Sequence, residues 1–235
     1  MLQVKRITQD HLHQNQIKDQ YNHDAKSYFY QQVMGGGTQS IHYGIYEKED
    51  WSQQRAILQT KQVMFNMVKD ILPQKPVILE LGSGLGGTAS YLLQKLPWAH
   101  LTGINLCETQ NKINRVSLEQ QGYRGRFQIM EGDFSNLPDT LYESFDLAMS
   151  QEAFCHALNI ETTLSQIKKC LKPGGILVFS DLMTQDKASN KNSIFQATNA
   201  VARLFSPNYY HQLADKLGWE KIEHLDLTSH LTKNF

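Results

Sequence analysis

A glycine-rich loop with the sequence GSGLGG follows a short apolar segment in the first half of the chain. The loop spans residues 82–87 and comes directly after Val77–Leu81. Glycines in such a loop let the backbone turn sharply and let a ligand approach closely. Gly82, Gly84 and Gly87 fit the G-x-G-x-x-G spacing of a nucleotide-binding loop, and the residues after them predict a helix. The spacing alone does not say which nucleotide binds.

Glu80 lies two residues before the first glycine and bears on that choice. A dinucleotide would place an anionic pyrophosphate at the start of the helix, where a carboxylate would repel it. S-adenosylmethionine instead carries an α-ammonium group and a sulfonium, and a carboxylate suits these cations directly or through water. Glu80 therefore favours S-adenosylmethionine over a nicotinamide dinucleotide. A plain tight turn with a solvated glutamate would also explain the sequence.

The stretch ILELGSGLGG resembles motif I of the class I S-adenosylmethionine-dependent methyltransferases, and three later segments follow in the family's order. Asn105 ends the second predicted strand, where the family usually has an acid on the ribose hydroxyls. An amide still hydrogen-bonds a diol, but without charge assistance. The GDF turn resembles the one that holds adenine, with Asp133 on the exocyclic amine and Phe134 against the ring. LKPGG, residues 171–175, resembles the structural loop before the fifth strand.

This resemblance implies an α/β fold with a doubly wound, mainly parallel, Rossmann-like sheet and an N-terminal helical cap. It also implies S-adenosylmethionine as the cofactor. The residues expected to hold it are Glu80, Gly82, Ser83, Gly84, Gly86, Asn105, Leu106, Gln110, Asp133, Phe134 and Gln151.

Beyond motif I, the sequence resembles the sarcosine/dimethylglycine N-methyltransferases and the phosphoethanolamine methyltransferases. The N-terminal match runs over residues 21–46, and SQEAFCH at 150–156 matches the stretch after the fourth strand. The resemblance implies a small soluble amine, of the glycine, sarcosine or dimethylglycine kind, as the methyl acceptor. Three alternatives stay open: an O- or C-methyltransferase of a larger natural product or sugar, a nicotinamide-dependent oxidoreductase, and a binding module without catalysis.

An ammonium group must lose a proton before it attacks a methyl carbon, so the reaction needs a base or a shifted substrate pKa. His156 follows the fourth predicted strand, at the edge where ligands bind in such sheets, and its pKa range suits this task. In the phosphoethanolamine enzymes the matching histidine pairs with an early tyrosine over the substrate. The resemblance therefore implies a catalytic pair of Tyr21 and His156. A helix-end histidine and a packed tyrosine would explain both without a role.

Aromatic side chains of the N-terminal part would suit a methylated ammonium through cation–π contacts, although packing explains them equally well. Arg203 is the candidate to meet the carboxylate of an amino-acid substrate. The other histidines, His13 among them, show no metal-ligand spacing and are expected at the surface. No metal is expected. The predicted acceptor-binding residues are Tyr30, His42, Tyr43, Glu152, Phe154 and Arg203.

Strands and helices that would position these residues alternate along the chain, which predicts a parallel sheet with helices on both faces. Strands are expected at 77–81, 101–104, 127–130, 145–149, 176–179 and 219–227. Helices are expected at 53–72, 86–95, 108–121, before Pro173, near 194–205, and from Pro207, with Ser206 as its N-cap and Gly218 as its C-cap. Three parts are expected: a cap or lid over 1–52, a cofactor-binding core over 53–183, and C-terminal helices with an edge strand over 184–235.

The last part departs from the family pattern. Methyltransferases of this class normally finish with an antiparallel strand beside the one expected at 219–227, and nothing after His230 supplies it. Either the chain is cut short or the edge strand comes from elsewhere. An uncovered edge would be prone to pairing with another chain.

Composition narrows the partners. Lys plus Arg and Asp plus Glu are 23 each, so the formal net charge is zero, which argues against a nucleic-acid partner. No stretch approaches the roughly 18 apolar residues of a membrane-spanning helix. The N-terminus is too polar for a secretory signal, and three widely spaced cysteines predict no disulfide framework. We expect a cytoplasmic protein, monomeric or homodimeric, that acts on a small molecule.

Overall fold

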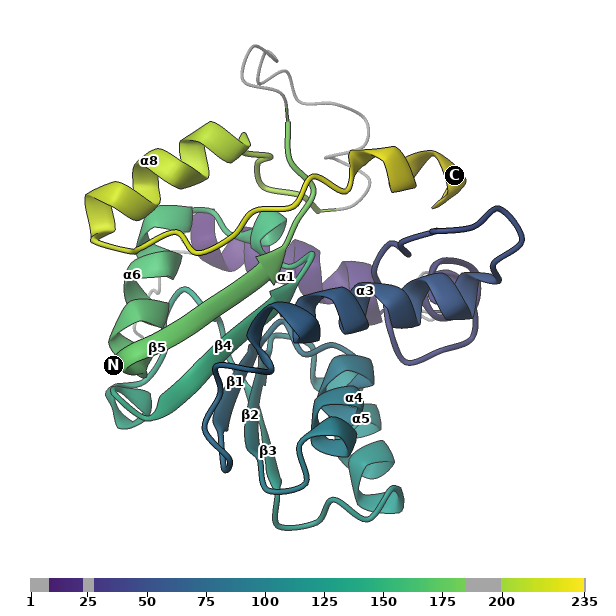
Figure 1. Cartoon of the computed structure of the whole chain (residues 1–235), viewed down its shortest axis with the longest axis horizontal. Helices are drawn as coiled ribbons and strands as arrows, with labels where there is room; N and C mark the ends of the chain where they lie inside the picture. The colour runs from purple at the N-terminus through teal and green to yellow at the C-terminus, as the bar shows by residue number, and fades with distance from the viewer. Residues whose placement is uncertain (1–8, 23–27, 185–199, 235) are drawn as a thin grey trace, which may run out of the picture.

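The protein is built on a five-stranded sheet, seen here in a computed structural model that describes residues 9–22, 28–184 and 200–234. The strands are β1 (Val77–Leu81), β2 (His100–Asn105), β3 (Phe127–Glu131), β4 (Phe145–Gln151) and β5 (Leu171–Ser180). Their order is β3-β2-β1-β4-β5, and every neighbouring pair is parallel. From β1 the chain first adds β2 and β3 on one side and then adds β4 and β5 on the other, so the strand order reverses beside β1 (Figure 1). The predicted doubly wound parallel sheet is confirmed.

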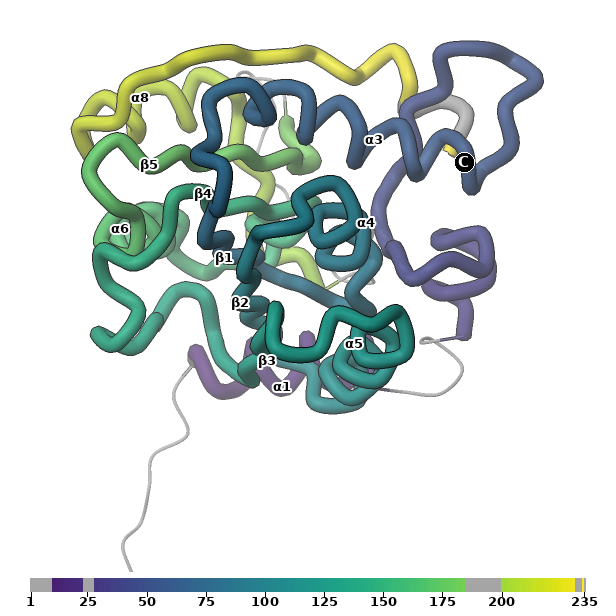
Figure 2. Tube along the Cα trace, turned by 60° about the horizontal axis from the view of Figure 1, so that its bottom comes forward, coloured from purple at the N-terminus to yellow at the C-terminus, as the bar shows by residue number. Residues whose placement is uncertain are grey.

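Helices cover both faces of this sheet (Figures 1 and 2). They are α1 (Gln9–Asn22), α3 (Gln53–Val68), α4 (Gly87–Lys95), α5 (Glu108–Gln120), α6 (Ile160–Cys170) and α8 (Pro207–Leu217), with short helical segments at Phe29–Met34, Asp139–Leu141, Phe154–His156 and Thr228–Asn234. On one face α3, α4 and α5 pack on the sheet through residues such as Met64, Leu92 and Leu118. On the other face α6 and α8 contribute Leu164 and Leu213. The alternation of side chains along each strand therefore fills two separate cores.

Local sequence signals set the ends of several helices. The Ser206 side chain accepts a hydrogen bond from a first-turn N–H of α8, Pro207 is the first residue, and Gly218 ends the helix with φ 69°. These three cap assignments are confirmed. Ser52 and Asn159 cap α3 and α6 in the same way.

The strand predicted at 219–227 is wrong, because these residues form no regular element. Trp219 packs partly against the core, but Ile222 is 70% exposed and Leu225 is 43% exposed, so the rest of this segment lacks the buried apolar face of a strand. The antiparallel strand with which the family normally finishes, and which the sequence does not supply after His230, is likewise absent from the described sheet, whose strands are all parallel. The helix predicted near 194–205 is also wrong over 201–205, while residues 194–199 lie outside the described residues.

LKPGG, residues 171–175, is not a separate loop, because it forms the first half of β5. Gly174 there has φ 77°, and the pairing with β4 shifts register between Phe145 and Leu147. A glycine suits this irregularity because its backbone adopts positive φ without steric cost. The predicted helix 53–72 ends earlier, at Val68.

The N- and C-terminal parts of the chain contact each other. Figure 2 shows the C-terminal segment running back from α8 across the molecule towards the N-terminal part. There the Asn234 side chain accepts a hydrogen bond from Gly44 N–H at 2.8 Å and donates to Gly44 O at 3.1 Å. His230 Nδ1 donates to Tyr46 O at 2.9 Å. The predicted division into three parts stays a prediction, although its first and third parts are in contact.

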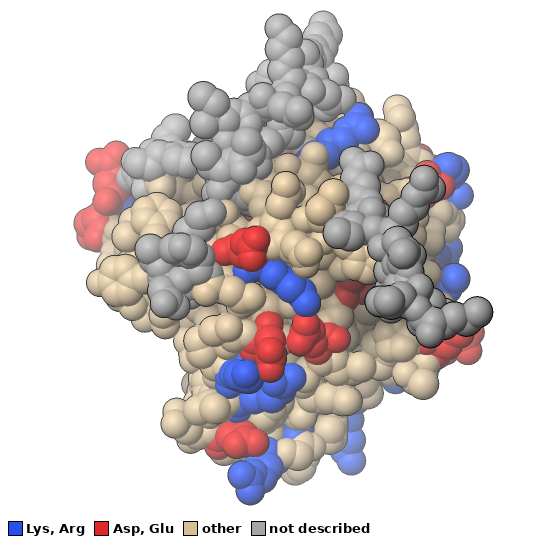
Figure 3. Space-filling model, turned by 180° about the vertical axis from the view of Figure 1, so that it is seen from behind, with Lys and Arg blue, Asp and Glu red and all other residues tan. Residues whose placement is uncertain are grey.

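Charged side chains of both signs are interspersed over the face seen in Figure 3, where Lys and Arg lie among Asp and Glu. Lys18 and Glu131 form a partly exposed ion pair at 2.8 Å. Among the residues described, no helix has both the length and the apolar character to cross a membrane. Within the same residues, no group of three His, Cys, Asp or Glu side chains is arranged to hold a metal ion.

Candidate active site

The glycine loop lies at the carboxyl end of β1, beside the point where the strand order reverses. Gly82, Gly84 and Gly86 have φ values of 72°, 50° and 91°, which favour glycine over other residues. A side chain at Gly82 would lie 2.5 Å from Cβ of Ala153, so close packing also requires glycine there. Ligands of such sheets bind in the crevice at this switch point. The loop that the sequence singled out is therefore at the expected place.

Glu80 is buried at the end of β1, only 4% exposed. Burial raises the pKa of its carboxyl, while the nearby Lys61 ammonium on α3 and the Ala89 N–H at the start of α4 oppose that rise. Burial in turn lowers the pKa of Lys61, and Glu80 opposes that shift. The Glu80 atom Oε2 has no hydrogen-bond partner. The sequence predicted Glu80 but not its partner Lys61, because the two meet only through packing of α3 on the sheet.

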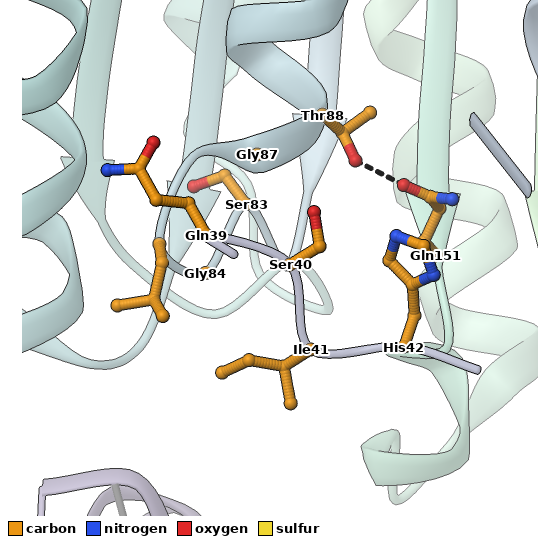
Figure 4. Close-up of a pocket in the computed structure, with 10 residues that line it drawn as sticks. Gln39, Ser40, Ile41, His42, Ser83, Gly84, Gly87, Thr88 and Gln151 are labelled. Carbon is orange, nitrogen blue, oxygen red and sulfur yellow. Dashed lines mark hydrogen bonds between the residues drawn. The ribbon is translucent and has the colours of Figure 1, made fainter. Parts of the chain in front are cut away.

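A strap formed by residues 39–42 lies against the glycine loop and lines a pocket with it. The carbonyl of Gln39 accepts a hydrogen bond from Gly87 N–H at 3.0 Å, and Lys61 Nζ donates to Ser40 Oγ at 2.9 Å. In Figure 4 the His42 ring points towards Gln151, whose side chain accepts a hydrogen bond from the Thr88 hydroxyl. The pocket therefore has walls from the cap, β4 and α4.

The ends of β2 and β3 carry the residues predicted for ribose and adenine. Asn105 Nδ2 donates to Gln110 Oε1 and Asn111 Oδ1, each at 3.1 Å, and Leu106 follows it. The Asp133 carboxylate accepts a hydrogen bond from Gln14 Nε2 on α1 at 2.8 Å. Helix α1 thus crosses this end of the site, which the sequence did not indicate.

These residues fit S-adenosylmethionine. The glycine loop leaves room for close approach of a ligand, and carboxylates stand at Glu80 and Asp133. Among the described residues, four buried polar atoms around the loop lack hydrogen-bond partners: Oε2 of Glu80, Nε2 of His42, Nε2 of Gln151 and Oδ1 of Asn114. Because buried polar groups are nearly always paired, such atoms indicate where a polar ligand binds.

Glu152 follows β4 and lies on the other side of the strap. Its backbone has φ 49°, a strained value for a residue with a side chain, and its N–H donates to Ser180 O at 2.8 Å. Its Oε1 accepts a hydrogen bond from Tyr43 N–H at 2.9 Å. Burial raises the pKa of Glu152 to about 8, the Tyr43 bond opposes this, and Asp181 adds to it. Strain and burial together hold a carboxyl group at the end of a strand where ligands bind.

Tyr21 and His156 are in contact, as the resemblance implied. The Tyr21 hydroxyl lies 3.1 Å from His156 Nε2, and His156 Nδ1 lies 2.9 Å from the Ala200 carbonyl oxygen. A carbonyl oxygen only accepts, so Nδ1 carries the proton and Nε2 accepts from Tyr21. Burial raises the pKa of Tyr21 well above its usual value and lowers that of His156. Both His156 nitrogens are therefore engaged.

His13 corrects an expectation, because it is half-buried and its Nε2 bonds the His156 carbonyl at 2.8 Å rather than lying free at the surface. Tyr30 is buried, accepts a hydrogen bond from Gln20, and its ring centroid lies 5.2 Å from that of Tyr21. The Tyr43 hydroxyl interacts electrostatically with both Tyr30 and Glu152. Tyr21, Tyr30, Tyr43 and Glu152 therefore lie close together.

Two predicted acceptor-binding residues do not belong to this group. Phe154 is 0% exposed and packs in the core between Phe134 and Phe179, so it offers no surface to a substrate. Arg203 is exposed, and its guanidinium lies 5.0 Å from the Phe205 ring centre. Phe134 is itself 7% exposed in the same core, and its role against adenine stays a prediction.

Comparison with known proteins agrees with this geometry. A methyltransferase domain family matches residues 79–179. A glycine/sarcosine/dimethylglycine N-methyltransferase of Actinopolyspora halophila is 32% identical over 93% of this chain and 38% of its own length. A sarcosine/dimethylglycine N-methyltransferase of Aphanothece halophytica is 28% identical over 94% of this chain and 78% of its own.

Among solved structures, one from Galdieria sulphuraria assigned as a sarcosine dimethylglycine methyltransferase is 27% identical, with a TM-score of 0.74. The match covers 84% of this chain and 73% of that one. In its fold, its site and its relatives the chain is similar to the class I S-adenosylmethionine-dependent methyltransferases, which favours this class over the oxidoreductase alternative. Within that class it is similar to the sarcosine/dimethylglycine N-methyltransferases, although it spans only 38% of the length of the Actinopolyspora relative.

Proposed function

We propose that this protein transfers a methyl group from S-adenosylmethionine to the nitrogen of a small amine of the glycine, sarcosine or dimethylglycine kind. The observation that carries the proposal is the half-buried Glu152 carboxyl, which accepts a hydrogen bond from Tyr43 N–H and lies beside Tyr21 and Tyr30. A carboxylate attracts an ammonium group, and aromatic faces attract its methylated forms through cation–π contacts. The names of the relatives support the same substrate class.

In this reaction a nitrogen–carbon bond forms, the carbon–sulfur bond of the donor breaks, and S-adenosylhomocysteine leaves. The acceptor nitrogen needs a free lone pair, so its ammonium form must first lose a proton. Burial favours the neutral forms of the Glu152 carboxyl and of the acceptor amine, because it raises the pKa of Glu152 and would lower the pKa of a bound ammonium. Glu152 is therefore our candidate for the proton acceptor, in place of His156.

His156 acts by holding Tyr21. The Nε2 atom of His156 accepts a hydrogen bond from the Tyr21 hydroxyl at 3.1 Å, and its Nδ1–H donates to the Ala200 carbonyl oxygen. The rings meet edge to face with centroids 5.8 Å apart. This contact ties the N-terminal helix to the end of β4, which keeps water out of the space beside Glu152.

The test is methyl transfer from labelled S-adenosylmethionine to glycine, sarcosine, dimethylglycine, phosphoethanolamine, phenols and sugars. We expect turnover of an amine, and Glu152→Gln should lower its kcat/KM by about 100-fold or more, the range of a general base. Glu108→Gln is the matched control, because Glu108 is an exposed residue that pairs with Lys112. Turnover confined to phenols, sugars or larger metabolites would overturn the amine proposal in favour of O- or C-methylation.

A further inference from the structure

His42 has one nitrogen engaged and one without a partner. Its Nδ1 lies 3.0 Å from the Tyr43 carbonyl oxygen, and its buried Nε2 has no hydrogen-bond partner among the residues that the structure describes. The ring lines the pocket between the strap and the glycine loop, beside Gln151 (Figure 4). A buried histidine nitrogen without a partner costs free energy unless a ligand meets it.

The hydrogen bond of Nδ1 determines whether Nε2 of His42 is a donor or an acceptor. A carbonyl oxygen only accepts hydrogen bonds, so Nδ1 must carry the proton. Burial lowers the pKa of His42 to about 4, with a smaller opposing effect of the Tyr43 carbonyl, so the ring is neutral near pH 7. Nε2 therefore presents a lone pair, and its natural partner is a hydrogen-bond donor.

Charged groups around His42 come from two elements. Lys61 on α3 faces the strap, but its Nζ already donates to Ser40 Oγ at 2.9 Å and to Gly87 O at 3.4 Å, and it lies near Glu80 of β1. Their opposite charges offset each other, so a zwitterion meets no net repulsion here. The Gln151 side chain adds a free donor, because its oxygen accepts from Thr88 while Nε2 has no partner.

We propose that His42 accepts a hydrogen bond from the α-ammonium of S-adenosylmethionine and that Gln151 Nε2 donates one to its α-carboxylate. The strap would then recognise an α-amino-acid zwitterion, and His42 would bind the methyl donor rather than the methyl acceptor expected from the sequence. This inference rests on the proposed function only for the identity of the donor. It does not depend on which amine is methylated.

The experiment is calorimetric binding of four ligands to the whole chain without acceptor: S-adenosylhomocysteine, its analogue without the α-amino group, its analogue without the carboxylate, and 5′-methylthioadenosine. His42→Phe keeps a ring without the lone pair, and His42→Gln restores an acceptor atom. Gln151→Leu removes the amide. His100→Phe is the matched control on an exposed histidine of β2.

We expect His42→Phe to weaken the two ligands that retain the ammonium about 10-fold, the size of one hydrogen bond to a charged group. The deamino analogue and 5′-methylthioadenosine should bind it as they bind the wild type, and His42→Gln should recover part of the loss. Gln151→Leu should weaken the two ligands that retain the carboxylate. Equal weakening of all four ligands, or loss confined to carboxylate-bearing ligands in His42→Phe, would overturn the proposal.

These outcomes are separate from the fate of the proposed function. If no amine is methylated but His42→Phe discriminates the ligands as expected, the zwitterion site stands and the acceptor proposal fails. If amines are methylated but His42→Phe binds every ligand normally, the acceptor proposal stands and the zwitterion site fails.

Discussion

Two glutamates stand at the carboxyl ends of adjacent strands, the buried Glu80 near the end of β1 and the half-buried Glu152 directly after β4, and their surroundings differ. Glu80 has the opposite charge of Lys61 beside it, whereas Glu152 has the like charge of Asp181. Consecutive residues reach the two sides: His42 of the strap lines the pocket at the glycine loop, and the N–H of Tyr43, which follows the strap, donates to Glu152. Burial raises the pKa of both carboxyls to about 8, so the two sites differ in the sign of the neighbouring charge rather than in pKa, and on that difference we assign the cation to Glu80 and the proton exchange to Glu152.

The proposed difference between Glu80 and Glu152 can be tested by replacing each of them with glutamine. Glu80→Gln should weaken S-adenosylhomocysteine by about 10-fold or more, since it loses an ion pair with the ammonium, and leave the KM of the amine within about twofold. Glu152→Gln should leave the Kd of S-adenosylhomocysteine within about twofold. Binding calorimetry and steady-state kinetics on both variants measure this. A loss of cofactor affinity in Glu152→Gln equal to that in Glu80→Gln would contradict the division.

Lys61 sharpens the comparison, because it opposes the raised pKa of Glu80. Lys61→Met should raise that pKa further, so that more Glu80 is protonated near pH 7 and the ammonium binds more weakly. We expect about a fivefold loss of S-adenosylhomocysteine affinity at pH 6.5 that narrows by pH 8.5, as a shift of under one pKa unit implies. Lys61→Arg keeps the charge and is the control. A loss independent of pH would mean that Lys61 acts only through Ser40.

The smallest effect is on stability. The pKa of Glu152 in the folded chain is about 8, above the ordinary 4.5, so the folded state binds more protons between these values. Its contribution is fully present below about pH 4.5 and is lost as the pH rises through about 8. Glu152→Gln should therefore raise Tm by a few degrees at pH 8 and little at pH 5, at roughly 2–4 °C per kcal/mol for a chain of this size.

Glu80→Gln is the partner measurement, followed by thermal unfolding over the same pH range. It should stabilise less than Glu152→Gln, because removing Glu80 leaves the Lys61 ammonium buried without its counter-charge. Equal gains in both variants would show that neighbouring charge does not distinguish the two sites.

The sequence determined those features that a few consecutive residues specify. The glycine loop, the alternation of strands and helices, and the Ser206, Pro207 and Gly218 caps depend on backbone conformations that short segments prefer by themselves. Where a local pattern was weak, as at 219–227, the prediction failed, because apolar residues without a surface to pack on do not form a strand.

Only the tertiary structure decided how the side chains function. Tyr21 and His156 are 135 positions apart, and Gln14 and Asp133 are 119 apart. The lone pair of His42 is defined by a backbone carbonyl and by burial, and the different surroundings of Glu80 and Glu152 come from helices packed on the sheet. A pKa and a tautomer depend on neighbours in space, and residue types in order along the chain do not specify those neighbours.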